Sequence, residues 1–150
     1  MSLSQLIEVV MLRVALLMLL FISYLFSADI AIVKKLDGEV FAKRKSEMVK
    51  LKVGDQLQVG DTLITQLNSS IGIIFHAGTI VSLGEKSILS IDKYLFKPVE
   101  KNFKFDIDLH KGIASFESGK ISELSPESVK FKVPEGTIGI RGTKFYVEVK

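Results

Sequence analysis

The last fifteen residues of the chain, Gly136–Lys150, read GTIGIRGTKFYVEVK, and this stretch decides the fold class that we predict. Its second half alternates apolar and polar side chains, with Phe145, Val147 and Val149 on one face of an extended strand. Before the strand, Arg141 stands between glycines, which permit a positive φ or a close approach of two backbone segments. We therefore predict a sharp bend that presents an arginine, followed by a closing β-strand.

Two interpretations of Arg141 follow from its chemistry. Its guanidinium is planar and carries five donors, which suits a fixed ion pair that pins the bend, and this is the role that we expect. The alternative is that Arg141 belongs to a binding surface. The glycines at three-residue spacing, Gly136, Gly139 and Gly142, do not indicate a phosphate loop, because G-x-G-x-x-G is absent and a strand follows where that loop needs a helix.

The closing stretch resembles the end of the FecR-type domain. The residues that fill the places of that motif are Thr137, Gly139, Arg141, Gly142 and Thr143. The resemblance extends upstream through the V-G-D-x-L-x-T stretch and through turns at residues 68–70, 77–79 and 83–84. It implies a binding or sensing function in the cell envelope.

In the regulators that gave this family its name, such a domain lies on the periplasmic side. There it relays an iron-uptake signal from an outer-membrane transporter to a cytoplasmic sigma factor. This chain departs from that pattern, because at most a dozen residues precede its hydrophobic segment, too few for a sigma-binding domain. We expect only the sensor or interaction module, standing alone.

The composition narrows the function classes. The chain has 150 residues, and its 20 Lys and Arg are interspersed with 17 acids, giving a net charge of +3 that does not indicate nucleic-acid binding. Cysteine is absent, which excludes disulfides, thiolate catalysis and cysteine-based zinc sites. The length allows one β domain, residues 29–150, after an N-terminal leader, residues 1–28.

The leader contains an apolar run, Val14–Phe26, that is short for a membrane span and typical of a signal peptide. Glu8 stands where a basic region is expected, so the true start of translation is predicted at Met11, and cleavage is predicted after Ser27 or Ala28. An uncleaved anchor is the alternative, since the segment from Leu3 onward holds enough apolar residues to span. The predicted location is therefore periplasmic or otherwise exported, or anchored at the inner membrane, with membrane contact only through this segment.

From Ala31 onward the pattern is that of many short strands. Asp37-Gly38 predicts a two-residue hairpin between strands 31–36 and 39–44. The polar cluster Lys43–Glu47 is interpreted as a solvated loop. A short repeat follows, VGDQL at 53–57 and VGDTL at 59–63, and a longer one relates 62–71 to 79–88 at an offset of seventeen residues. Such repeats indicate stacking, so we predict a rolled or solenoid-like β sandwich.

The later part of the chain predicts further strands at 88–92, 94–96 and 112–117, and a helical turn within Ser118–Ser128. Phe103–Leu109 alternates strictly, with its aromatic and aliphatic residues inward and Asp106 and Asp108 outward. Altogether we expect about ten short strands, an ordinary number for a β domain. The phenylalanines fall mostly on inward positions and are interpreted as core rather than as a base-stacking surface.

No constellation in the sequence predicts catalysis, a cofactor or a metal. His76 and His110 lie beside turns and are interpreted as loop residues, because neither has metal-ligand spacing. The outward pair Asp106 and Asp108 is interpreted as a solvated face rather than a calcium site. No serine stands in a nucleophile elbow, so the prediction is a protein that is not an enzyme.

We expect instead an envelope protein as partner, with a glycan as a second class of ligand. The alternative function is a structural envelope protein that presents strand edges to carbohydrate, peptidoglycan or a partner strand. Thr143–Lys150 or a neighbouring strand is the edge expected to lie near a partner, because its outward side chains alternate in charge.

Overall fold

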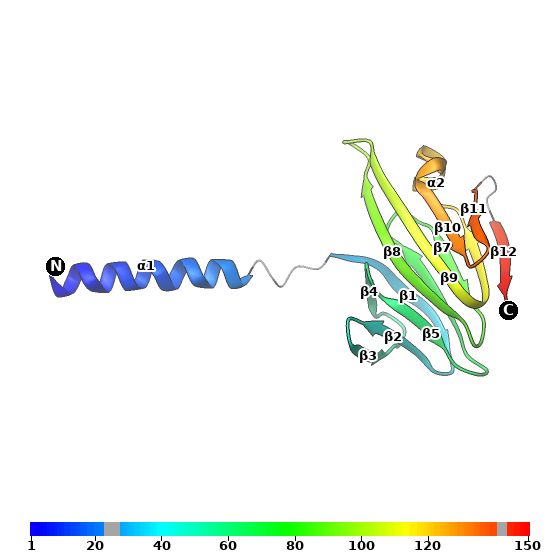
Figure 1. Cartoon of the computed structure of the whole chain (residues 1–150), viewed down its shortest axis with the longest axis horizontal. Helices are drawn as coiled ribbons and strands as arrows, with labels where there is room; N and C mark the ends of the chain where they lie inside the picture. The colour runs from blue at the N-terminus through cyan, green and yellow to red at the C-terminus, as the bar shows by residue number, and fades with distance from the viewer. Residues whose placement is uncertain (23–27, 141–143) are drawn as a thin grey trace.

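The computed structural model describes residues 1–22, 28–140 and 144–150. Helix α1 (Leu3–Ile22) lies apart from a β domain that begins with β1 (Asp29–Asp37) (Figure 1). The other elements are β2 (Val40–Arg44), β3 (Glu47–Lys50), β4 (Gln56–Gln58), β5 (Thr62–Thr65), β6 (Ser70–Phe75), β7 (Ile80–Leu83), β8 (Ile88–Lys97), β9 (Asn102–Glu117), α2 (Lys120–Leu124), the 3-10 turn η2 (Pro126–Ser128), β10 (Val129–Val133), β11 (Gly136–Ile138) and β12 (Lys144–Val149). The prediction of an all-β fold after an apolar helix is confirmed, with twelve strands in the described ranges.

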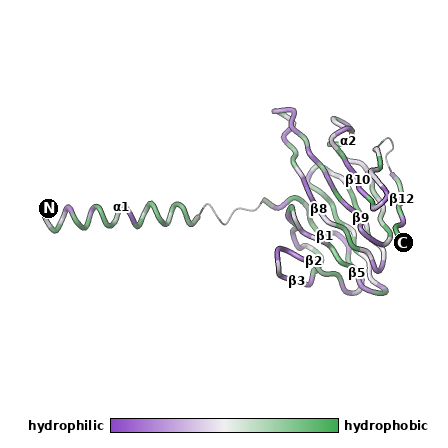
Figure 2. The backbone as a smooth tube through the Cα atoms, in the orientation of Figure 1, coloured by the Kyte–Doolittle hydropathy of each residue, from purple (hydrophilic) through white to green (hydrophobic). Residues whose placement is uncertain are grey.

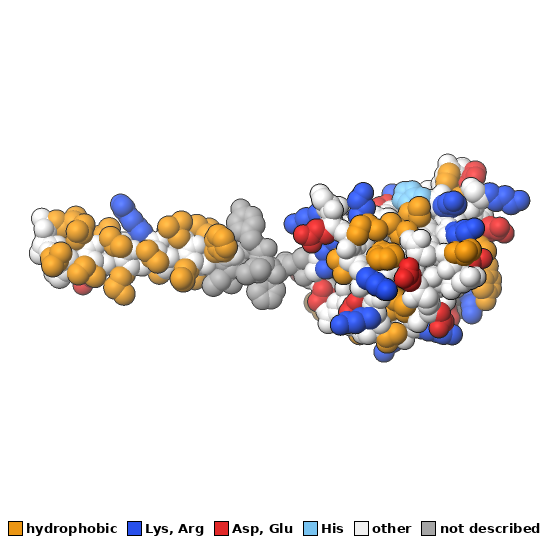
Figure 3. Space-filling model, turned by 90° about the horizontal axis from the view of Figure 1, so that it is seen from below, with side chains coloured by type: hydrophobic (Ala, Val, Ile, Leu, Met, Phe, Trp, Pro, Cys, Tyr) orange, Lys and Arg blue, Asp and Glu red, His pale blue; other side chains and the backbone are white. Residues whose placement is uncertain are grey.

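Helix α1 is long and apolar enough to cross a membrane. Its span Leu3–Phe21 covers 19 residues with a mean hydropathy of 2.1, and none of it is buried against the β domain. Figure 3 shows hydrophobic side chains along the helix, and Figure 2 shows that apolar residues follow one another there but alternate with polar ones along the strands. A signal sequence and an anchor both have these properties.

Strand β9 organises the sheet, because it belongs to two layers. Its first half pairs with β8 in antiparallel fashion and with β10 in parallel fashion. Its second half pairs with β7 and β12, both antiparallel. The sheet order β3-β2-β5-β8-β9-β7-β6-β1-β4 therefore curls through β9 from one layer to the other.

The change of layer occurs at two similar corners, Gly38 between β1 and β2 and Gly112 within β9. Both glycines have a positive φ, +74° and +98°, and at both a Cβ would overlap the side chain of a buried serine, Ser69 or Ser87. The backbone N–H that follows each glycine donates to that serine hydroxyl, at 2.8 Å and 3.0 Å. The two corners are thus built in the same way.

An approximate two-fold relation between two parts of the domain follows from these corners. β1 pairs with β6 as the first half of β9 pairs with β8, and β2 pairs with β5 as the second half of β9 pairs with β7. The equivalent serines, Ser69 and Ser87, are eighteen residues apart, so the predicted offset of seventeen is wrong by one. Successive residues of a strand point to opposite faces, so an offset of eighteen matches buried positions of one copy with buried positions of the other. An offset of seventeen would match buried positions with exposed ones.

The VGD repeat gives two equivalent turns that attach to different layers. In the first copy Asp55 accepts from the N–H of Val33 at 2.9 Å, and in the second Asp61 accepts from the N–H of Ile91 at 2.9 Å, each through its backbone carbonyl. Each aspartate side chain also accepts from the backbone N–H three residues earlier, at 2.9 Å. The repeat therefore connects β1 of one layer with β8 of the other.

Several local predictions are corrected by the pairing. Asp37-Gly38 does not form a hairpin, because β1 pairs with β4 and β6 while β2 pairs with β3 and β5. Within the cluster Lys43–Glu47, residues 45–46 form the turn of the β2–β3 hairpin, whereas the other three residues belong to its two strands rather than to a loop. Residues 88–97 form one strand, and 112–117 continue β9. The helical turn predicted within 118–128 is confirmed as α2 and η2.

An aromatic chain runs through the core between the two layers. Neighbouring rings have centroids 4.6 Å to 6.1 Å apart, and the chain consists of Phe75, Tyr94, Phe105, Phe116, Phe131 and Phe145. Burial raises the pKa of the Tyr94 phenol, and the Ala77 N–H, which donates to its oxygen at 2.9 Å, acts in the opposite direction. The prediction that these phenylalanines form the core is confirmed.

The corner at Gly112 predicts a stability effect. Gly112→Ala should lower the free energy of unfolding by about 2–4 kcal/mol, because the new Cβ is both strained at positive φ and in collision with Ser87. Gly54→Ala is the matched control, since Gly54 has a similar φ of +92° with open space around it, and should cost about 1–2 kcal/mol. Urea unfolding of the full chain in mild detergent, followed by circular dichroism, measures both. Equal losses would contradict the collision at Gly112.

Candidate functional site

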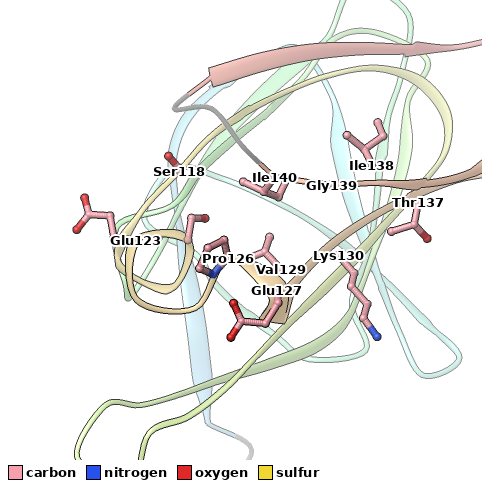
Figure 4. A pocket seen from close by; sticks show the side chains of 11 residues that line it. Ser118, Glu123, Pro126, Glu127, Val129, Lys130, Thr137, Ile138, Gly139 and Ile140 are labelled. Atoms are coloured by element: carbon pink, nitrogen blue, oxygen red, sulfur yellow. The ribbon is translucent and has the colours of Figure 1, made fainter.

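A cavity of about 850 Å³ opens beside the closing motif (Figure 4). Its walls come from the segment around α2 and η2, from β10, and from β11 with the residues after it. The lining residues are Ser118, Ser122, Glu123, Pro126, Glu127, Val129, Lys130, Thr137, Ile138, Gly139 and Ile140. Segments on both sides of β10 in the sequence thus meet at one site.

The α2 wall is fixed to the body of the domain by a close backbone approach. A Cβ at Gly119 would overlap the backbone of residues 77–79, lying 2.6 Å from the Ala77 oxygen. The N–H of Lys120 donates to that oxygen at 2.8 Å. Since the Ala77 N–H also donates to Tyr94, this turn ties α2 to the aromatic core. A larger residue at 119 would push the wall away.

The η2 wall is ordered by hydroxyl and carboxylate groups. Ser125 donates to the Glu127 carboxylate at 2.7 Å, and its hydroxyl lies 2.6 Å from that of Ser128. The pKa of Glu127 is lowered, first by its own backbone N–H and then by the Ser125 hydroxyl. Glu127 therefore keeps its negative charge at the cavity mouth at neutral pH.

The cavity combines an apolar interior with charged groups at its edge. Pro126, Val129 and Ile140 supply apolar surface, and the charged residues are Glu123, Glu127 and Lys130. Figure 4 shows the charged ends of these three side chains around the outside of the apolar group. The Ser122 hydroxyl is enclosed and has no hydrogen-bond partner among the described residues. Such a lining suits the recognition of a group with apolar and polar parts.

The motif residues predicted from the sequence are only partly placed. Thr137 and Gly139 line the cavity. Arg141, Gly142 and Thr143 lie outside the described residues, so the expected ion pair of Arg141 stays a prediction. Gly139 does not adopt a positive φ, and a Cβ there would meet open space. The bend predicted around Arg141 involves residues outside the described ranges and stays a prediction.

An ion pair that sequence reasoning missed joins the partly exposed Arg44 to the buried Asp61. The guanidinium donates to both carboxylate oxygens at 2.8 Å, and the Asp61 side chain is fully buried. The hydrogen bond to Asp61 raises the pKa of Arg44, against the effect of partial burial. A signal existed in the sequence, because Asp61 is the acid of the second VGD copy. Its partner Arg44 belongs to the cluster Lys43–Glu47, which the sequence analysis interpreted as a solvated loop.

The outer face of β9 carries a lysine and aspartate network. Asp106, predicted to be solvated, is only 6% exposed and lies 3.6 Å from Lys132 and 4.0 Å from Lys93. This happens because β10 pairs in parallel beside β9 and covers the edge that the strand pattern left open. The prediction for Asp106 is therefore wrong, and its carboxylate is paired with lysines instead.

His110 lies within β9 rather than in a loop, so that prediction is also wrong. Its Nε2 is 3.0 Å from the Ser90 hydroxyl, and its Nδ1 is 4.0 Å from Asp108, on an exposed face of the sheet. Ser90 also donates to Asp92 at 3.0 Å. Its backbone pairs with Thr62 of β5 on one side and with Asp108 of β9 on the other.

The described parts of the chain do not bring metal-binding side chains together in one group. Within residues 1–22, 28–140 and 144–150, no group of three or more histidine, aspartate or glutamate side chains could hold an ion. On β9, Asp106 lies among lysines, and Asp108 lies 4.0 Å from His110. The cavity beside the closing motif is therefore the candidate site best supported by its shape and lining.

Comparisons with known proteins bear on the family. A search of curated proteins gave no match. A solved structure described as a cell surface anchoring domain is 35% identical over 41% of this chain and 82% of its own, with a TM-score of 0.40. The model of the family described as FecR protein matches residues 61–150, which include Asp61 of the second VGD copy, β9, the cavity and the closing motif. Because this match covers more than half of the chain, the protein belongs to the FecR family.

Proposed function

We propose that this chain is an exported binding or sensing module of the cell envelope, acting in signalling through recognition of a protein or ligand. The observation that carries the proposal is the cavity beside the closing motif, because Thr137 and Gly139 of that motif line it. Family membership and the apolar helix α1 support the envelope as its place of action. In this proposal α1 directs export, and the β domain works in the periplasm, released by cleavage or held at the inner membrane.

The lining of the cavity favours recognition over catalysis. Its apolar residues can bury part of a ligand, while Glu127 and Lys130 offer charges of both signs at the mouth. The walls are fixed by backbone and hydroxyl contacts, so little ordering would be needed on binding. The partner class that we propose is an envelope protein, with a glycan as the second class.

A second candidate function is a structural role at the cell envelope. The observation in its favour is the set of exposed strand edges, of which β3 is exposed at all four residues. An edge of this kind can accept a partner strand or contact carbohydrate or peptidoglycan. In that case binding would depend on β3 or β12 and not on the cavity.

Filling the cavity tests the proposed function. Gly139→Trp places a large side chain where a Cβ meets open space, without a positive φ to strain it. We expect the tagged full chain to capture at least about tenfold less of its envelope partner, a loss of about 1.4 kcal/mol of binding free energy. The measurement is cross-linking and affinity capture from the envelope fraction, with mass spectrometry of the products.

The control introduces the same side chain outside the site. Val99 is 97% exposed at the β8–β9 turn, so Val99→Trp should capture as much partner as the parent chain. Circular dichroism must show that both variants fold. Undiminished capture by the folded Gly139→Trp chain would remove the cavity from the recognition site and favour the structural role.

A further inference from the structure

Strand β12 forms an open edge of its layer. It pairs with β9 along its whole length, from Lys144 opposite Glu117 to Val149 opposite Gly112. No second neighbour pairs with β12 among the described residues. Figure 1 shows the strand at the outer side of the β domain, next to the C-terminus. Its outer edge can therefore accept one more strand.

The side chains of β12 are arranged so that they would complement those of a second, antiparallel β12. On the outward face Lys144, Tyr146 and Glu148 are exposed, with Tyr146 at 72%. On the inward face Phe145 and Val147 are half-buried against the core. A strand laid antiparallel to β12 and centred on Tyr146 would therefore meet complementary groups if it were β12 itself.

We propose that two copies of this chain associate through their β12 edges, antiparallel and centred on Tyr146. In this register Lys144 of each copy lies opposite Glu148 of the other, so two ion pairs form. The two Tyr146 rings lie opposite each other at the two-fold axis. Phe145 of each copy lies opposite Val147 of the other and extends the covered face of the layer. The inference goes beyond the proposed function and does not depend on the cavity.

Another edge strand, β3, has four residues and fits a second copy less well. All four of its residues are exposed, so pairing there would continue no buried face. Its Lys50 already lies 3.6 Å from Glu39 of the same chain. In β12 the Lys144 ammonium lies 5.6 Å from the centre of the Tyr146 ring within the same chain, so it stays on the outward face, where the second copy's Glu148 would lie opposite Lys144. Charge complementarity and the half-buried inward face therefore both favour β12.

A single cysteine tests the register directly, because the chain has no native cysteine. Directly opposed residues of antiparallel strands have Cα atoms about 4.5–5.5 Å apart, which a disulfide can bridge. The full-length Tyr146→Cys chain, oxidised in mild detergent, should form a covalent dimer. Lys144→Cys is the matched control, since its two copies would be four residues apart along the strand, about 13 Å, and should not cross-link.

Charge exchange tests the same contact without a new bond. Lys144→Glu alone should weaken the full-length dimer about tenfold, because both ion pairs become repulsive, and Glu148→Lys alone should do the same. Mixing the two variants should restore association as a heterodimer, since each then offers the charge that the other lacks. Sedimentation velocity and native mass spectrometry in mild detergent measure these species.

The outcomes separate this contact from association through α1, which the variants leave unchanged. A parent chain that is monomeric, equal cross-linking at positions 144 and 146, or a dimer that is insensitive to both charge changes would each overturn the proposal. Cross-linking confined to Tyr146→Cys, with recovery on mixing the charge variants, would support it. Circular dichroism of each variant confirms that β12 still closes the fold.

Discussion

Phe116→Ala should lower the free energy of unfolding by about 3–5 kcal/mol, the range typical of a buried phenylalanine removed from a core. Phe116 is fully buried, and its ring lies 5.2 Å from that of Phe145 and 6.1 Å from those of Phe105 and Phe131. Since these residues come from β9, β10 and β12, the cavity left behind would loosen several strands at once. Urea unfolding of the full chain in mild detergent measures the change.

Phe103→Ala is the control for this prediction. Phe103 lies on the same strand but is half-buried, and its ring lies 5.9 Å from that of Phe96. Because less apolar surface returns to water, its loss should cost about 1–2 kcal/mol. Similar losses for the two variants would show that the aromatic chain is not the main support of the layers.

Arg44→Met should destabilise the domain by about 3–5 kcal/mol, because it leaves the carboxylate of Asp61 buried without its cation. The methionine keeps most of the apolar stem, so packing changes little. Arg44→Lys should recover only part of the loss, since an ammonium cannot make the two parallel contacts at 2.8 Å. The midpoint of urea unfolding reports each effect.

The double variant Arg44→Met with Asp61→Asn separates charge from packing. The amide removes the stranded negative charge and can still accept from the Gln58 N–H, so the double variant should be more stable than Arg44→Met alone. Asp55→Asn offers a further comparison, because Asp55 makes the same turn contact in the first VGD copy but has no Arg44 hydrogen bond. It should cost less than about 1 kcal/mol. A double variant no better than Arg44→Met would contradict the buried-charge explanation.

Much of the fold could be predicted from the sequence because strand periodicity is a local signal. Alternation placed Phe105 and Phe116 in the core, and the closing motif gave the family. The corner at Gly38 was missed because a glycine with positive φ serves equally well in a hairpin and in a change of layer. Which of the two occurs depends on distant strands, β5 and β6, that the local pattern does not specify.

The site was less predictable, because its parts meet only in three dimensions. Arg44 and Asp61 are seventeen residues apart, and Asp106 is buried by β10, which follows it by more than twenty. The cavity forms only where α2, β10 and β11 come together, so no short sequence motif predicts it. Thr137 and Gly139 were singled out because the family resemblance marked them, whereas Ser122 carried no signal of its own.

The position of β9 in the sheet has a consequence for the order in which the chain can fold. Without residues 102–117 the sheet consists of two separate segments, β3-β2-β5-β8 and β7-β6-β1-β4. A chain made from its N-terminus therefore lacks the strand that joins them until two thirds of its length has been synthesised. Such a late joining strand delays closure of the sheet until β9 has been made. The emerging chain would stay loose until then, as threading through a translocation channel in the proposed export would require.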